Sequence, residues 1–402
     1  MKKALVCAMG LLVAGTARAQ EVKFTPNLDV RLRWEHFEQD GMPEDADAVT
    51  LRVRPGVAAS WRNWTALVDV DAVVALTRSY NDGFNGKTRY PLIPDAENLE
   101  LNRAQLRYAG KDGLAITAGR QRLNFADDRF VGNAPWRQSE RTYDSVRFQY
   151  GKPLGLSTDV AYSWSVRTTD GRQGRGSRPQ AIGGDNVFAL VNYGTKVGTL
   201  SGFAYLVDQD EAAVQGFRLS TQTYGVRFSG SRPLGKDVSL GYAASWARQS
   251  NYHRNPNRYA ADYWMGEVKL MAGGLTVIAG HEVLGAYKGV ALTSVQTPLA
   301  PLFKFNGWAG KFGTNPPNGL RDLYGNVGYA WKKVGPLDAI NVGAIYHRFH
   351  SDRLDLQYGD EFDFIAGVKH GRYALSARYG RYKAKQFATD TDKLFIQLDW
   401  AL

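Results

Sequence analysis

The sequence predicts an all-β fold, a transmembrane antiparallel β-barrel of about 18 strands. Three observations carry this prediction. Apolar and polar residues alternate along segments of roughly ten residues or more, the length that a tilted strand needs to cross a bilayer. Tight turns and long loops alternate between these segments. The chain also starts with a segment that is typical of secreted proteins.

Residues 1–19 have the order of a secretory signal peptide. The first three residues, MKK, are positive, residues 4–15 are apolar, and an ARA cleavage motif ends at Ala19. The apolar run is too short to cross a bilayer as a helix. We therefore expect a cleaved signal peptide at 1–19 and one barrel at 20–402, placed in the outer membrane of a Gram-negative cell.

The composition excludes several kinds of chemistry. The one cysteine, Cys7, lies in the signal peptide, so the mature chain has no thiol for disulfides, thiolate metal sites or catalysis. The net charge is +11, and removing Lys2, Lys3 and Arg18 with the signal peptide leaves +8 (11 less 3). Such a charge fits an anionic lipid or an acidic ligand, and secretion argues against nucleic acid. We expect no cofactor and no bound metal.

The last segment shows the strand pattern most clearly. Apolar residues occupy alternate positions from Leu394 to Leu402, and Lys393, Gln397 and Asp399 occupy the other face. An apolar final strand with an aromatic residue near its end is the signal that barrel assembly machinery reads. Similar alternation recurs at 28–35, 50–62, 64–74, 162–167, 223–229 and 361–369.

The connections between the predicted strands fall into two classes. Short turns are expected at 62–63, 110–113, 151–155, 194–195, 232–235, 272–274, 333–336 and 370–371. Long loops are expected at 39–47, 79–97, 123–141, 168–185, 208–219, 249–257, 285–319, 350–357 and 384–391. This pattern predicts periplasmic turns, extracellular loops and two periplasmic termini. The outer surface should meet membrane lipid and lipopolysaccharide.

A barrel of this size leaves an aqueous channel, so the residues that face the lumen should decide what passes. By alternation, the inward arginines include Arg31, Arg33, Arg52, Arg54, Arg103, Arg107 and Arg147. They either form a basic path that selects an anion, or they pair with the acidic residues of the same face and only keep the lumen polar. Both interpretations stay open at this point.

Several stretches of sequence resemble the alginate export porin family. They are LNRAQLRY (101–108), GRQRL (119–123), WRQ (136–138), YDSVR (143–147), QTPLAPLFKFNGWAGKF (296–312) and PPNGLRDLY (316–324). The resemblance spans nearly all of the mature chain. It implies an eighteen-stranded barrel whose arginine-rich constriction passes a polyuronate. Arg103, Arg120, Arg122 and Asp144 lie on motif positions of the family and become candidates for the constriction.

Two of these candidates conflict with strict alternation. Leu114, Ile116 and Ala118 are expected to face outward, which would turn Arg120 and Arg122 outward as well. A charge that faces lipid near the middle of the bilayer costs ~2–4 kcal/mol. We expect either a β-bulge at Gly119 that reverses the register, or a position at the extracellular rim.

The loop at 285–319 is the second candidate region. It is long, rich in aromatic residues and prolines, and unlike a disordered segment in composition. We expect it to fold into or over the pore mouth, where its rings could stack on sugars, or else to pack only against neighbouring loops. Its candidate residues are Phe303, Lys304, Phe305, Asn306, Trp308 and Lys311, with Arg321 and Asp322 just after it.

No catalytic constellation is predicted, and the chain is not expected to be an enzyme. The segment HRFHSD contains His347 and His350, but positions three apart on a strand face opposite sides. The expected function is a passive channel for an alginate-like acidic polysaccharide, with periplasmic partners for export or uptake. The alternative is a general or small-anion diffusion porin, and a rim hydrolase is a third hypothesis.

Overall fold

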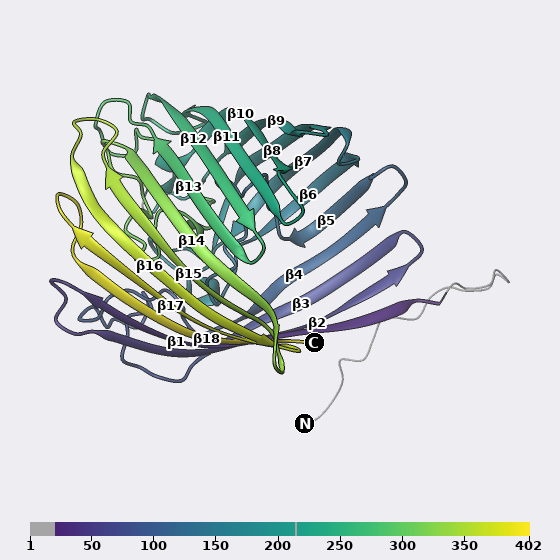
Figure 1. Cartoon of the computed structure of the whole chain (residues 1–402), viewed down its shortest axis with the longest axis horizontal. Coiled ribbons are helices and arrows are strands. Elements are labelled where there is room, and N and C mark those ends of the chain that lie inside the picture. The colour runs from purple at the N-terminus through teal and green to yellow at the C-terminus, as the bar shows by residue number, and fades with distance from the viewer. Residues whose placement is uncertain (1–20, 214) are drawn as a thin grey trace.

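The computed structural model describes residues 21–213 and 215–402, which form one closed antiparallel sheet of 18 strands. Each strand pairs with its neighbours in the sequence, and β18 (Thr391–Ala401) pairs with β1 (Lys23–Gln39) to close the barrel. Figure 1 shows this closure, because the yellow β18 lies beside the purple β1. The predicted barrel and its strand number are confirmed; the signal peptide expected at 1–19 lies outside the described residues.

The other strands follow in chain order. They are β2 (Ala46–Trp61), β3 (Trp64–Ala75), β4 (Asn98–Ala109), β5 (Ala115–Gln121), β6 (Thr142–Gly151), β7 (Gly155–Arg167), β8 (Ala181–Thr195), β9 (Gly198–Val207), β10 (Thr221–Pro233), β11 (Val238–Asn251), β12 (Ala260–Ala272), β13 (Leu275–Leu284), β14 (Leu320–Val334), β15 (Leu337–His350), β16 (Gln357–His370) and β17 (Tyr373–Ala384). Three short 3-10 turns lie in loops: η1 (Gly171–Gln173), η2 (Gly216–Leu219) and η3 (Leu302–Lys304). Within the described ranges, no helix is long and apolar enough to span a membrane.

The alternation in the sequence becomes two faces of one wall. In β10, Val226 is 49% exposed and points outward, whereas Arg227 between it and Phe228 is half-buried in the lumen. Aromatic side chains pair across outward positions, as the half-buried Trp246 and the exposed Trp264 do with ring centroids 6.1 Å apart. An apolar outer face with aromatic residues is what a barrel wall in hydrocarbon requires.

Long and short connections lie at opposite ends of the wall. The described strand ends leave long loops after each odd-numbered strand and tight turns after each even-numbered one, as the sequence predicts. Because the sheet is antiparallel, β1 begins and β18 ends at the short-turn end. The start of β1 and the end of β18 therefore lie on the same side of the barrel.

Two long loops enter the barrel, and we call them the first inward loop (122–141) and the second inward loop (285–319). The first inward loop follows β5, yet it contacts the distant strands β2, β13 and β18. Gln138 donates to the Thr50 hydroxyl at 2.8 Å, Arg129 to Glu282 at 2.6 Å, and Trp136 packs on Phe395. These strands lie on different sides of the barrel, so the loop must cross its interior.

The two inward loops also contact each other. Val131 and Leu299 form an isolated parallel bridge, and the Gly132 amide donates to the Leu299 carbonyl at 3.0 Å. Arg141 donates to the Pro298 and Ala300 carbonyls at 3.2 Å. Because the loops share backbone bonds inside the wall, they narrow the lumen as one unit.

The wall has a notch beside the short strand β5. This strand has 7 residues and pairs with β4 only between Ala104 and Ala109, so the Asn98–Arg103 part of β4 lacks a β5 partner. Arg120 fills the notch from the end of β5. Its Nη1 donates to the Leu101 carbonyl at 3.0 Å, and its Nε and Nη2 donate to Asp144 on β6 at 2.7 and 3.0 Å. Unpaired backbone groups are costly in hydrocarbon, so this side chain completes the wall.

Replacing Arg120 with alanine should destabilise the barrel. It leaves Asp144 and the Leu101 carbonyl without their donor, which we expect to lower the free energy of unfolding by about 1–3 kcal/mol. Urea unfolding in lipid vesicles measures the change. Arg248→Ala is the matched control, because Arg248 pairs with Asp262 at 2.9 Å between fully paired strands. Equal losses in the two variants would contradict a sealing role for Arg120.

Candidate pore constriction

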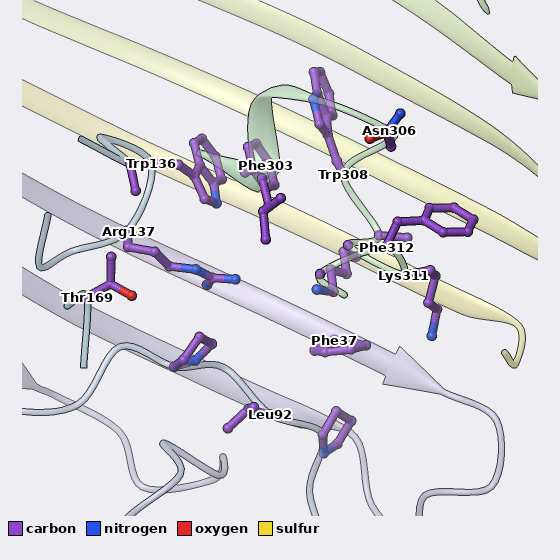
Figure 2. Close-up of a pocket in the computed structure, with 18 of the residues that line it drawn as sticks. Phe37, Leu92, Trp136, Arg137, Thr169, Phe303, Asn306, Trp308, Lys311 and Phe312 are labelled. Atoms are coloured by element: carbon purple, nitrogen blue, oxygen red, sulfur yellow. The ribbon is translucent and has the colours of Figure 1, made fainter. Parts of the chain in front are cut away.

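An aromatic stack joins the two inward loops. The rings of Trp136 and Phe303 lie 3.7 Å apart at an interplanar angle of 1°, and Trp308 continues the stack 5.9 Å from Phe303. Phe395 of β18 contacts Trp136 edge-on at 5.0 Å. Figure 2 shows Trp136 and Phe303 side by side, with Arg137 extending below them. The stack anchors the loops against the β18 side of the lumen.

Two wall arginines lie against this stack. The guanidinium carbons of Arg33 and Arg378 are 4.2 and 4.5 Å from the centre of the Trp136 ring, distances typical of cation–π contacts. Arg33 also donates to Gln397 and lies 3.4 Å from Asp95. Arg378 forms no ion pair with any residue that the structure describes, and its buried Nε has no partner. Instead, its guanidinium lies over the rings of Trp136, Phe303 and Trp308.

A cavity of about 520 Å³ lies at the long-loop end of the stack. Aromatic side chains line it, among them Phe37, Trp136 and Phe303. Its charged lining residues are Arg137, Arg141, Lys311 and Lys393. No carboxylate occurs among the described residues of this lining. We call this space the basic cavity.

Several donors at the basic cavity are unused. Arg137 Nη1 and Trp136 Nε1 are buried without a hydrogen-bond partner. Arg137 reaches Glu35 and Asp95 only at 3.9 Å, too far for a hydrogen bond. Lys393 lies 4.0 Å from the centre of the Phe37 ring, and no carboxylate oxygen in the described chain lies within 4.0 Å of its ammonium. Buried donors without partners favour an anion, because leaving them unpaired is costly.

Lys311 is a cation of the basic cavity that lies in a loop, and its pKa is lowered by burial. Its Nζ donates to Gln39 Oε1 at 3.3 Å. Burial lowers the pKa of Lys311 to about 8, although the carboxylates of Glu361, Asp390 and Asp40 act in the opposite direction. The ammonium is therefore charged at neutral pH and loses its proton in mildly alkaline solution.

Most of the predicted lumen arginines pair with carboxylates. They therefore keep the lumen polar and do not form a free basic path. Arg31 pairs with Asp399 at 2.8 Å, Arg54 with Asp71 at 2.9 Å, Arg52 with Asp29, Arg103 with Asp69, and Arg147 with Asp159. Arg107 differs, because it donates to the neutral groups of Thr117 and Gln149 at 3.2 and 3.1 Å.

Arg122 joins this paired set through the first inward loop. Its Nη2 lies 2.7 Å from Glu140, which also lies 3.3 Å from Arg54 Nη1. Burial by itself would raise the pKa of Glu140, but Arg54 and Arg122 outweigh it and lower the pKa to about 2. Glu140 is therefore a fixed negative charge that is shared by two of the predicted constriction arginines.

The structure does not bring Arg120 and Asp144 into the lumen. Gly119 has a positive φ of 109°, but the β4–β5 and β5–β6 pairings continue past it without a shift. Arg120 therefore keeps the outward parity of Ile116 and Ala118. The β-bulge expected at Gly119 to turn this arginine inward is absent, and the ion pair seals the wall instead.

The candidate residues in and just after the second inward loop lie in different parts of the barrel. Phe303, Phe305, Asn306, Trp308 and Lys311 line the basic cavity. Lys304 donates to the Asp127 carbonyl at 2.6 Å, Asp322 accepts from Asn306 inside the barrel, and Arg321 bonds Asp355 at 2.6 Å at the rim. The loop does fold into the barrel, but Arg321 faces away from the path.

Sequence reasoning missed the residues that matter most at the cavity. Arg137, Arg141 and Lys393 were not among the candidates, and Trp136 was noticed only as part of a motif. Alternation along β17 and β18 places Arg378 and Lys393 inward, so that signal was present. The approach of Trp136 to Phe303, 167 positions further along the chain, has no local signal.

Comparison with known proteins gives structural relatives only. No family model and no curated sequence matches the chain. OccAB4 of Acinetobacter baumannii is 12% identical with a TM-score of 0.69, covering 96% of this chain and 100% of that one. OpdL of Pseudomonas aeruginosa is 15% identical with a TM-score of 0.66, covering 94% and 98%. OpdK of the same organism, solved with vanillate, is 12% identical with a TM-score of 0.64, covering 94% and 98%.

At these identities the likeness shows the fold and no more. It nevertheless corrects the sequence interpretation. The resemblance to the alginate export porin family is wrong, since no family model matches and the similar solved barrels are Occ and Opd proteins.

The selectivity of the pore should depend on pH through Lys311. Because its ammonium is charged below its pKa of about 8, raising the pH from 7 to 9 should remove the Lys311 charge and lower the ratio of chloride to potassium permeability. Reversal potentials in planar bilayers measure this ratio. Lys311→Gln should shrink the step, whereas Lys288→Gln, at an exposed position of the same loop, should keep it. A step of full size in Lys311→Gln would contradict the assignment.

Proposed function

We propose that the protein is a passive outer-membrane channel for small organic anions, with a preference for a planar ring that carries a carboxylate. One observation carries the proposal: the basic cavity combines four cationic side chains with aromatic rings and has no carboxylate in its described lining. This is the small-anion alternative of the sequence analysis. The long loops would face outward and both termini the periplasm.

The size of the internal spaces supports a small solute. The basic cavity of about 520 Å³ is within the range of about 300–1,000 Å³ that is usual for drug-sized ligands. The paired inward loops occupy the lumen beside it, and Phe303 stacks directly on Trp136. A solute of one or two rings fits these dimensions.

The chemistry of the cavity supports an aromatic carboxylate. Unused donors of Arg137, Trp136 and Lys393 suit carboxylate oxygens, because charge-assisted hydrogen bonds are short and strong. The aromatic side chains of the lining suit a planar ring. OpdK, which shares this fold, was solved with vanillate, an aromatic carboxylate. That observation belongs to OpdK and supports the same solute class here.

Movement through the channel needs no energy input in this proposal. A solute leaves the basic cavity when its carboxylate moves from the cations of the cavity to Arg378 and then to the wall arginines. The wall arginines bind the solute more weakly, because each already pairs with a carboxylate of the protein. Conduction requires sites that attract a solute without trapping it. The concentration gradient then sets the direction.

A hydrolase at the rim is the weaker candidate. His347 is buried, and its Nδ1 lies 2.9 Å from Asp322, which also accepts a hydrogen bond from Asn306 of the second inward loop. His350 belongs to the opposite face of β15. This arrangement holds a loop, and among the described residues the hydrogen-bond partner of His347 is Asp322 rather than a serine or cysteine.

Liposome swelling with matched solutes tests the function. Benzoate should enter faster than neutral benzamide, and benzamide faster than cationic benzylamine, because only the first complements the cavity. Equal rates for the three solutes would contradict a selective anion channel. Faster entry of benzylamine would indicate a preference for cations and would also contradict the proposal.

Variants locate the site of selection. Arg137→Gln and Lys393→Gln should each weaken benzoate binding, seen as block of chloride current, by about tenfold, since a charge-assisted hydrogen bond contributes about 1.5–3 kcal/mol. Lys111→Gln, in an exposed turn at the other end, should bind benzoate like the wild type. Unchanged block in both cavity variants would place the binding site elsewhere.

A further inference from the structure

The tip of the second inward loop, residues 305–308, divides the lumen. Phe305, Asn306 and Trp308 line the basic cavity and also a second cavity of about 300 Å³. The second cavity is bordered by the walls of β12 to β15, with Glu267, Glu282 and Asp322 among its lining. The position of this tip therefore sets the passage between the two spaces.

The backbone of the tip cannot hold this position by itself. Asn306 and Gly307 have consecutive positive φ values of 56° and 83°. Asparagine tolerates this conformation better than most residues, and glycine adopts it freely. A side chain at position 307 would meet the carboxylate of Glu361, so the tip lies directly against the wall. A turn of this kind persists when its surroundings fix it.

The Asn306 amide connects the tip to three other parts of the protein. Its Oδ1 accepts from Arg129 of the first inward loop at 2.9 Å. Its Nδ2 donates to Glu282 of β13 at 2.9 Å and to Asp322 of β14 at 3.0 Å. Asn306 is 6% exposed and Arg129 is 1% exposed, so water does not compete for these bonds.

Trp308 and Ala309 bind the wall through their backbone amides. The Trp308 amide donates to Asp363 at 3.3 Å, and the Ala309 amide donates to Glu361 at 2.6 Å. Both carboxylates belong to β16 and are fully buried. The tip is thus held on β13, β14 and β16 at once, with wall carboxylates as the acceptors.

We propose that Asn306 is the positioning residue of the constriction and that its amide, rather than the barrel wall, fixes the conducting cross-section. This inference rests on the proposed channel function. Arg129 takes part by binding both Asn306 and Glu282, which ties the first inward loop to the same point. Only a group with both a donor and an acceptor can serve Arg129 and the wall carboxylates together.

Asn306→Asp tests the proposal with a nearly isosteric change. The new carboxylate cannot donate to Glu282 or Asp322 and adds a negative charge beside them. The tip should move away from β13 and β14, while the Trp308 and Ala309 amides stay on β16. This movement should join the two cavities, so single-channel conductance should rise by about twofold or more and the anion-to-cation permeability ratio should fall. The melting temperature of the barrel should stay near that of the wild type, because the strand ladder is untouched.

Controls separate positioning from added charge. Asn318→Asp adds the same charge elsewhere in the same loop and should conduct like the wild type. The exchange Asn306→Asp with Asp322→Asn restores one amide–carboxylate bond and should move conductance back towards the wild-type value. If Asn306→Asp does not assemble, Asn306→Ala removes the same donors without a charge and should also widen the pore.

Wild-type conductance in Asn306→Asp or Asn306→Ala would overturn the role of Asn306. The same follows if the exchange variant conducts like Asn306→Asp alone. A wild-type pore that prefers cations would instead overturn the proposed function, and a wider pore in Asn306→Asp would then still support the positioning role. The two failures are therefore distinguishable.

Discussion

Every strand of this barrel must be hydrogen-bonded along both edges, because hydrocarbon offers no partner for an open backbone group. Pairing of β18 with β1 meets this constraint globally and fixes a wide circumference. Arg120 meets it locally where β5 is too short to cover β4. A wall that cannot contract leaves a wide lumen, so selectivity has to come from segments placed inside it. The two inward loops are these segments, and contacts with the wall hold them in position.

Charge in the lumen follows a second rule, that a buried charge needs a partner. Most lumen arginines satisfy it within the protein, as Arg54 does with Asp71 and Glu140. The exceptions gather at the basic cavity. There Arg137 reaches carboxylates only at 3.9 Å, Lys393 has no carboxylate of the described chain within 4.0 Å, and Trp136 keeps an unused donor. A small anion that brings a carboxylate supplies the missing partner. The same reasoning explains why the number of arginines in the sequence overstated their role in the path, since pairing removes most of them.

The sequence predicted what depends on local patterns. Alternation and the two classes of connection predicted the barrel. Strict alternation at Ile116 and Ala118 also pointed Arg120 outward, but we expected a β-bulge at Gly119 or a position at the rim, and the ladder shows no such bulge. Contacts between distant segments could not be predicted. The stack of Trp136 on Phe303 and the binding of Asn306 to Arg129, Glu282 and Asp322 arise only when both loops enter the same lumen. The alginate family interpretation failed because its motifs describe strand alternation and loop composition, whereas solute choice depends on which charges remain unpaired after folding.

The central claim is that unpaired cations beside an aromatic stack bind a carboxylate inside the barrel. A crystal structure of the protein soaked with 4-bromobenzoate tests it directly, because the anomalous signal of bromine locates the solute without reference to the protein. The account predicts one bromine peak in the basic cavity, with the carboxylate within hydrogen-bond distance of Arg137 or Lys393. Bromine peaks confined to the lipid-facing surface, or a carboxylate that avoids these cations, would contradict it.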